Sequence, residues 1–140
     1  MKFGGTSVGD VAAFERVIHV VSSQIERRPV VVVSAMTKVT DALLAAFDTA
    51  KKGDFAAAVA SLEPHFERHV EVANHFIAEG SSNLFDAELQ FARDELSDLL
   101  MRASRRSLPL AMLKDAIVSY GEQLSSRLLS EALKSRGVAA

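Results

Sequence analysis

The feature that most constrains the fold is a glycine-rich turn placed between a short strand and an amphipathic helix. The strand spans Met1 to Phe3, and the run Gly4-Gly5-Thr6-Ser7 ends it, because adjacent glycines and hydroxyl residues favour a turn. Apolar residues then recur at three- and four-residue steps from Val11 to Ile25, which predicts a helix from Asp10 to about Arg28.

A second strand follows this helix. Pro29 ends the helix, and Val30 to Val33 is an unbroken β-branched run without polar alternation, which is typical of a parallel strand that is buried on both faces. Strand, helix and strand together form a βαβ unit. Ser7 and Asp10 resemble a capping box, so we expect the helix to begin inside the glycine-rich turn.

Helical spacing dominates the rest of the chain. It predicts a helix from Asp41 to Lys52 closed by Gly53, and a helical insertion over residues 54–106 with a stop at Gly80-Ser81-Ser82-Asn83. Pro64 kinks a helix there or starts a new one.

The helix around Pro64 has Ser61 as a candidate cap. A final long helix runs from Leu110 to Leu133 and ends at Gly137, and residues 138–140 resemble the entry to a third strand.

Composition narrows the class of protein. With 140 residues, 49% apolar and 24% charged residues, the chain fits one folded, soluble unit. A net charge of -2 offers no clustered positive charge for nucleic acid or an anionic membrane. Cysteine is absent, which removes disulfides, thiolate metal sites and cysteine nucleophiles and is compatible with a cytoplasmic location.

The glycine-rich turn is a candidate anion site. Glycines let the backbone approach a ligand, and free N–H groups at a helix start favour negative charge. The turn matches neither a P-loop nor the spaced three-glycine dinucleotide fingerprint. Lys2 strengthens the prediction, because an ammonium two residues before Gly4 could offset charge on a transferring phosphoryl group.

A second polar cluster follows the second strand. Ser34, Thr37, Lys38 and Thr40 lie in the connection after Val33. Ligands of open α/β sheets bind at the carboxyl ends of the strands, so we expect this connection and the glycine-rich turn to face one crevice. The alternative is that Thr37 or Thr40 only caps the following helix.

A glycine inside the last helix marks a third candidate. Gly121, in Tyr120-Gly121-Glu122, costs about 1 kcal/mol relative to alanine in a helix interior. Close approach of a ligand or another backbone beside Glu122 would explain it, as would a kink or packing against the sheet.

These three segments, in this order, resemble the motifs of the aspartate kinases within the amino-acid kinase superfamily. The matching runs are Lys2-Phe3-Gly4-Gly5-Thr6-Ser7-Val8, Val31-Val32-Val33-Ser34-Ala35-Met36 with Thr40-Asp41, and Ser119-Tyr120-Gly121-Glu122-Gln123-Leu124-Ser125. The helical insertion, including Arg68-His69-Val70-Glu71, is also similar to one in that family. The resemblance implies a partial three-layer α/β/α fold with a mainly parallel sheet, residues 1–140 being the N-terminal part of the kinase domain.

The resemblance also implies roles for individual residues. Lys2, Gly4, Gly5, Thr6 and Ser7 match the phosphate-binding strand and loop, with Lys2 as the catalytic residue that stabilises the transferred phosphoryl group. The positions that contact the amino-acid substrate are matched by Ser34, Thr40 and Glu122, with Glu122 facing the α-ammonium. Thr37 and Lys38 fall in a variable part of the motif and receive no role.

The implied reaction is phosphoryl transfer from ATP to the β-carboxylate of L-aspartate, the first step towards lysine, threonine and methionine. Mg²⁺ would bridge the ATP phosphates, and catalysis would rest on positioning and electrostatics. A homo-oligomer is expected. Such a kinase domain is about twice this length and precedes regulatory domains, so we expect the 140-residue chain alone to be inactive.

Two alternatives remain open. The first is another amino-acid kinase, or the kinase part of a bifunctional aspartokinase and homoserine dehydrogenase. The second is a non-catalytic module that self-associates through an exposed sheet edge.

Other patterns are assigned no function. His65 and His69 have the four-residue spacing of zinc ligands but lack the zincin Glu and a third ligand, so we expect a solvated helix surface and no metal site. His75 and Glu79 form an ordinary helix pair. The basic run Arg102, Arg105 and Arg106 complements a helix dipole.

Overall fold

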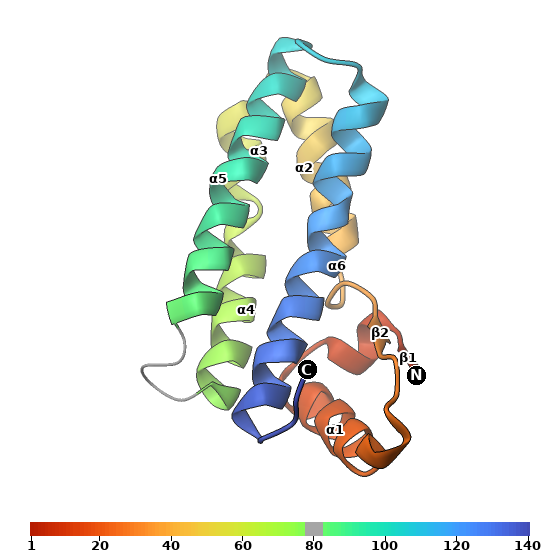
Figure 1. The fold of residues 1–140 in the computed structure, drawn as a ribbon. Helices are drawn as coiled ribbons and strands as arrows, with labels where there is room; N and C mark the ends of the chain where they lie inside the picture. Colours follow the sequence, from red (N-terminus) through yellow and green to blue (C-terminus); the bar gives the residue numbers. More distant parts are fainter. Residues whose placement is uncertain (78–82) are drawn as a thin grey trace.

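The chain forms one βαβ unit followed by a helical bundle (Figure 1). The computed structural model describes residues 1–77 and 83–140. Its elements are β1 (Lys2–Phe3), the 3₁₀ helix η1 (Gly5–Val8), α1 (Val11–Ser22), the 3₁₀ helix η2 (Ile25–Arg27), β2 (Val32–Val33), α2 (Val39–Lys51), α3 (Phe55–Ala60), α4 (Glu63–Phe76), α5 (Asn83–Arg105) and α6 (Leu110–Ser135). The sheet, α1 and α4 lie near the C-terminal half of α6, α2 and α3 lie near its N-terminal half, and α5 runs along its length (Figure 1).

The two strands pair in parallel, as the βαβ pattern predicts. Lys2 is in register with Val32 and Phe3 with Val33. The backbone N–H of Ser34 donates to the carbonyl oxygen of Phe3 at 3.0 Å, so the pairing extends to the carboxyl ends of both strands. The turn after β1 and the connection after β2 therefore both begin at the carboxyl end of the parallel sheet.

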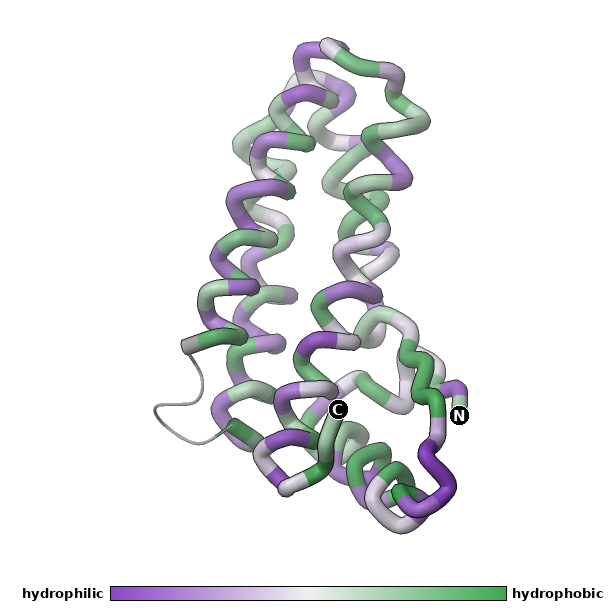
Figure 2. Tube along the Cα trace, viewed as in Figure 1, coloured by the Kyte–Doolittle hydropathy of each residue, from purple (hydrophilic) through white to green (hydrophobic). Residues whose placement is uncertain are grey.

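Only one face of this sheet is covered by the described residues. Phe3 and Val33 pack against the core, whereas Val30 is 78% exposed and Val32 is 53% exposed. The prediction of a strand buried on both faces is therefore wrong for these residues, because α1 and α6 cover the same face. The trace through β2 is nevertheless a hydrophobic stretch that follows a hydrophilic turn (Figure 2).

Helix α1 begins later and ends earlier than predicted. Asp10 is its N-cap, with a side-chain oxygen that accepts from the N–H of Ala13 at 2.8 Å. Ser7 lies within η1 and does not cap the helix. Arg28, the predicted helix end, instead follows η2 in a left-handed conformation with φ 49° and turns the chain towards β2.

The helical insertion forms as predicted, with one different cap. Pro64 lies in the first turn of α4, where a missing backbone N–H costs no helical hydrogen bond. Ser61 ends α3 rather than capping α4, and its hydroxyl donates to the carbonyl oxygen of Ala58. The predicted stop at Gly80-Ser81-Ser82 lies outside the described residues, as does Glu79 of the pair with His75.

Helix α6 ends at a Schellman motif centred on Gly137. Gly137 has φ 78°, its N–H donates to the carbonyl oxygen of Lys134, and the N–H of Val138 donates to that of Leu133. The glycine stop is confirmed. The predicted third strand does not form over residues 138–140, because the Val138 N–H bonds the helix end instead of a neighbouring strand.

A single apolar core joins the βαβ unit to the bundle. Phe14 of α1, Met36 of the connection after β2, Phe85 of α5 and Leu128 of α6 are each at most 1% exposed and belong to one cluster. Among the described residues, no helix is both long and apolar enough to cross a membrane.

Candidate functional site

The three segments singled out in the sequence meet at the connection after β2. This connection, Ser34 to Thr37, lies between the glycine-rich turn on one side and α6 on the other. A Cβ placed on Gly5 would lie 2.9 Å from the carbonyl oxygen of Ala35, and a Cβ placed on Gly121 would lie 2.8 Å from the Cβ of Ala35. Both glycines are thus required for close approach to the same residue.

The glycine-rich turn is a 3₁₀ turn rather than the start of α1. Gly4 is extended, with φ -78° and ψ 172°, and the N–H of Ser7 donates to its carbonyl oxygen at 2.9 Å. The N-terminus of α1 already holds the Asp10 carboxylate. The helix that begins in the glycine-rich turn is thus η1, whereas α1 begins after the turn with the Asp10 carboxylate at its N-terminus.

Thr37 connects the two loops directly. Its hydroxyl donates to the carbonyl oxygen of Gly5 at 2.8 Å. It does not cap the next helix, nor does Thr40, since α2 begins at Val39 with no side-chain cap. Lys38, the N-cap residue, adopts the left-handed conformation with φ 67°, which is costly for a residue with a side chain. The capping alternative is therefore wrong.

Helix α6 anchors the connection from the other side. The Ser125 hydroxyl is fully buried and donates to the carbonyl oxygen of Ser34 at 2.7 Å. Gly121 is buried against Ala35, Val39 and Leu43. Packing of the helix against the connection is thus the reason for the glycine, and the following residue, Glu122, is exposed.

The predicted site residues occupy these loops and their borders. Lys2 and Thr6 are exposed, as is Glu122, while Gly4, Gly5 and Ser7 are partly buried. Ser34 and Thr40 are also partly buried, at the end of β2 and in the first turn of α2. The backbone brings the turn, the connection and the Gly121 turn of α6 together.

Three contacts that organise these loops were not predicted from sequence. They are the Thr37 hydroxyl bond, the Ser125 hydroxyl bond, and a hydrogen bond from the Arg68 guanidinium of α4 to the carbonyl oxygen of Thr37. Ser125 belongs to the third motif, and Arg68 belongs to the segment Arg68-His69-Val70-Glu71 of the insertion. Their place in these segments was the one indication in the sequence that they matter. Each acceptor is a backbone carbonyl, which no residue pattern specifies.

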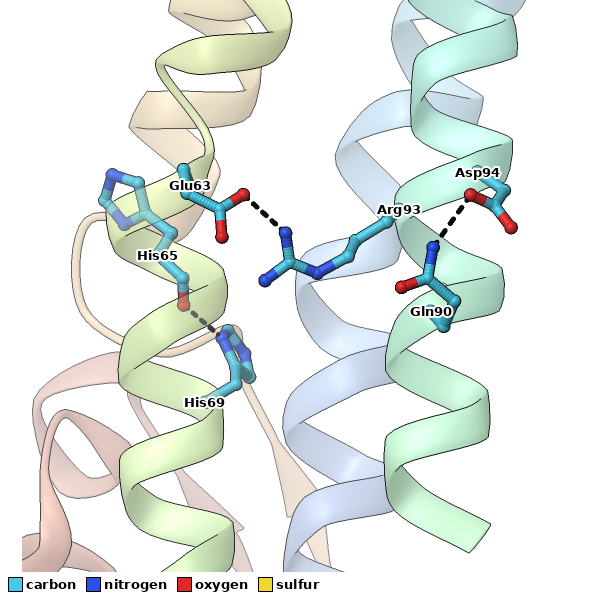
Figure 3. A network of polar contacts seen from close by, with 6 residues as sticks. All are labelled: Glu63, His65, His69, Gln90, Arg93 and Asp94. Atoms are coloured by element: carbon cyan, nitrogen blue, oxygen red, sulfur yellow. Dashed lines mark hydrogen bonds and ion pairs between the residues drawn. The ribbon is translucent and has the colours of Figure 1, made fainter. Parts of the chain in front are cut away.

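His65 and His69 lie one turn apart on α4. His69 is 1% exposed, so the prediction of a solvated surface is wrong for this residue. Its Nδ1 lies 2.6 Å from the carbonyl oxygen of His65 (Figure 3), and because a carbonyl only accepts, Nδ1 carries the proton. No group of three or more His, Cys, Asp or Glu side chains in the described part of the chain could hold a metal ion.

Burial keeps His69 neutral. Desolvation is the main cause that lowers its pKa from 6.5 to about 4, and the charges of Arg68 and His65 act in the same direction. Burial followed by the charge of Arg68 also lowers the pKa of His65. These imidazoles belong to the packing of α4.

A polar contact joins α4 to α5 on the outer side of the bundle. Arg93 reaches from α5 to the carboxylate of Glu63 (Figure 3), and its guanidinium lies 4.3 Å from the ring centroid of Phe66. This bond is the main cause that lowers the pKa of Glu63. The contact stabilises the insertion and involves no predicted site residue.

Two surface hollows differ in their position relative to the predicted site. A groove of about 660 Å³ lies between α5 and α6 and is bordered by Phe91 and Tyr120, and none of the predicted site residues lines it. A smaller hollow of about 170 Å³ is lined by Thr6, Ser7 and Arg16. Only the smaller one adjoins the glycine-rich turn.

Comparison with known proteins identifies the family. The model of the amino acid kinase family matches residues 1–140. A bifunctional aspartokinase/homoserine dehydrogenase 2 of Zea mays is 31% identical over 141 residues, covering 97% of this chain and 15% of the relative. Aspartokinase 3 of Bacillus subtilis is 31% identical over 150 residues, covering all of this chain and 30% of the relative.

Solved structures show the same similarity. Aspartokinase III of E. coli in complex with aspartate and ADP matches with a TM-score of 0.76 and 26% identity, covering 97% of this chain and 28% of that one. The same enzyme in complex with lysine and aspartate matches with a TM-score of 0.75 and 27% identity. This chain thus spans less than a third of the length of each of these proteins.

These matches agree with the ordered motifs and with the fold. The structure is helix-rich with a small parallel sheet, as expected for part of the α/β fold of these kinases. On the match over its whole length, the chain belongs to the amino acid kinase family.

Proposed function

We propose that this chain is the N-terminal part of an aspartate kinase domain, which transfers a phosphoryl group from ATP to the β-carboxylate of L-aspartate. The observation that supports this most strongly is the meeting of all three motif segments at Ser34 to Thr37. The similarity to Bacillus subtilis aspartokinase 3 and to the E. coli aspartokinase III structure with aspartate and ADP supports the same substrates.

The phosphate side of the proposed site is Lys2 with Gly4, Gly5, Thr6 and Ser7. Backbone N–H groups and hydroxyls of this turn would bind phosphate oxygens. The Lys2 ammonium would stabilise negative charge on the transferred phosphoryl group in the transition state. Exposure of Lys2 leaves its ammonium free to reach a ligand above the end of β1.

The substrate side is Ser34, Thr40 and Glu122. The Ser34 and Thr40 hydroxyls would hydrogen-bond L-aspartate, and the Glu122 carboxylate would pair with its α-ammonium. Gly121 and Ser125 fix this part of α6 on the connection, so they set the position of Glu122 relative to Ser34.

The chemistry needs no protein nucleophile. The substrate carboxylate attacks the γ-phosphorus of ATP and ADP leaves, so the protein contributes positioning and charge stabilisation. We propose that Mg²⁺ enters bound to the ATP phosphates, and no residue of this chain is assigned as its ligand. Such a reaction is the first step of lysine, threonine and methionine synthesis.

A titration followed by NMR tests the proposal on the 140-residue chain. Inorganic triphosphate should shift the amide signals of Gly4 to Ser7, and Lys2→Ala should weaken its binding. L-Aspartate should shift signals near Ser34, Thr40 and Glu122. Arg16→Ala is the matched control for a cation near the turn that the proposal does not use. Shifts confined to other regions would contradict the proposal.

A second candidate concerns association rather than catalysis. Within the described residues each strand of the two-stranded sheet has one neighbour, so each has an edge whose backbone groups could pair with a second copy. Light scattering distinguishes the two: a strictly monomeric chain at high concentration rejects sheet-edge pairing. A homo-oligomeric kinase, monofunctional or fused to homoserine dehydrogenase, remains part of the leading proposal.

A further inference from the structure

Arg68 connects the helical insertion to the predicted site. It lies on α4, and its guanidinium donates to the carbonyl oxygen of Thr37. No carboxylate in the described part of the chain forms a salt bridge with Arg68, and its buried Nε has no hydrogen-bond partner there. The bond to Thr37 is therefore the identified polar anchor of this side chain.

Thr37 in turn is hydrogen-bonded to the glycine-rich turn. Its hydroxyl donates to the carbonyl oxygen of Gly5 at 2.8 Å. A Cβ on Gly9 would lie 2.7 Å from the Thr37 hydroxyl oxygen, so the two segments are in tight contact. Two hydrogen bonds in series thus run from α4 to the connection and from the connection to the turn.

The backbone beside Thr37 needs such support. Lys38 adopts a left-handed conformation with φ 67° and ψ -1°, which persists in a residue with a side chain only where its surroundings hold it. The neighbouring contacts are the Arg68 bond, the Thr37 hydroxyl bond, and the N–H of Val39 donating to the carbonyl oxygen of Met36 at 3.0 Å.

We propose that Arg68 is a positioning residue that fixes the glycine-rich turn through Thr37. A charged donor makes a stronger hydrogen bond to a carbonyl than a neutral one, so the guanidinium holds Thr37 where its hydroxyl meets Gly5. The insertion thereby sets the geometry of the phosphate turn. This inference rests on the proposed function only in treating the turn as a phosphate-binding segment. The two hydrogen bonds themselves are features of the fold.

Hydrogen exchange tests this positioning role without any ligand. In Arg68→Ala and in Thr37→Val, the Ser7 and Val8 amides should exchange about tenfold faster, as expected for loss of a hydrogen bond of this kind. Amides of α6 near Leu128 should keep their rates. Arg68→Lys and Thr37→Ser, which retain a donor, should restore protection.

A double variant shows whether the two residues act in series. Arg68→Ala added to Thr37→Val should cause less further acceleration than Arg68→Ala causes alone. Arg93→Ala is the matched control, because Arg93 pairs with Glu63 and does not contact the connection. Unchanged Ser7 and Val8 exchange in Arg68→Ala, or equal acceleration of α6 amides, would overturn the proposal.

Titration with inorganic triphosphate separates this inference from the proposed function. Arg68→Ala should weaken triphosphate binding about tenfold if the turn loses its geometry, and Arg68→Lys should retain most of it. If the unmodified chain binds no triphosphate, the phosphate role of the turn fails, while the exchange rates still decide whether Arg68 positions it.

Discussion

At the scale of single residues, small side chains set how closely the motifs approach. Gly121 and Ala35 face one another, and any larger residue at either position would separate α6 from the connection after β2. The sequence shows a glycine at an unfavourable position inside a helix and leaves three explanations open: approach of a ligand, a kink, or packing. The contact distances show that packing is the explanation. The contact is with Ala35, 86 positions away in the chain, so local sequence patterns could not predict it.

The first prediction concerns this contact. Gly121→Ala should lower the free energy of unfolding by about 1 kcal/mol, because the steric cost of about 1–3 kcal/mol exceeds the helix-propensity gain of about 1 kcal/mol. Chemical denaturation measures this difference. Ala35→Gly in the same chain should recover part of the loss. Equal or greater stability of Gly121→Ala would show that the contact is not tight.

The second prediction concerns His69. Its pKa of about 4 in the folded chain lies below the ordinary value of 6.5, so folding favours the neutral imidazole. The unfolded chain takes up a proton first as the pH falls. Stability present above pH 6.5 should therefore be lost between about 6.5 and 4, by about 3 kcal/mol in total.

Unfolding measured at several pH values tests this. His69→Gln should reduce the pH dependence between 6.5 and 4. The contribution of His65 should remain in this variant, because burial also lowers the pKa of His65. The same pH dependence in His69→Gln and the unmodified chain would contradict the assignment.

At the scale of elements, the periodic segments were predicted well and their ends less so. Helices α2, α4, α5 and α6 follow from apolar spacing, and the ends of α2 and α6 follow from glycines with positive φ, Gly53 and Gly137. The start of α1 was misplaced because Ser7 and Asp10 both suit an N-cap, and only the Ala13 N–H bond chooses Asp10. The burial of β2 was overestimated because a β-branched run predicts a strand but does not show whether other elements cover both faces of the sheet.

A third prediction belongs to α1. Asp10→Ala should lower the free energy of unfolding by about 1 kcal/mol through loss of the N-cap, and Asp10→Asn should lose less. Asp41→Ala is the matched control, an exposed acid in the first turn of α2 that makes no capping bond. If Asp10→Ala and Asp41→Ala change stability equally, the cap contributes nothing measurable.

At the scale of the whole molecule, the chain holds the meeting point of three motifs but less than a third of the length of its relatives. In the part of the chain that the structure describes, the sheet has two strands and one uncovered face. Motif order was sufficient to predict the family, because three motifs in a fixed order are far more specific than any one of them. The contacts of Thr37, Arg68 and Ser125 were not predictable, since they join side chains to carbonyl groups across the fold.

A fourth prediction follows for the isolated chain. With MgATP and L-aspartate it should form negligible aspartyl phosphate, because it spans less than a third of the length of the aspartokinases it matches and we expect the nucleotide-base pocket outside residues 1–140. Trapping the product as the hydroxamate measures this. Hydroxamate formed by the 140-residue chain and abolished by Lys2→Ala would refute the prediction.

The central claim is that this chain supplies the phosphate turn and substrate residues of an aspartate kinase. The most direct measurement uses a chimera in which the chain replaces the matching segment of Bacillus subtilis aspartokinase 3, assayed for aspartyl hydroxamate. The chimera should be active, and Lys2→Ala should reduce its rate roughly 100-fold or more, with Arg16→Ala as control. A folded chimera without activity, or one unaffected by Lys2→Ala, would contradict the claim.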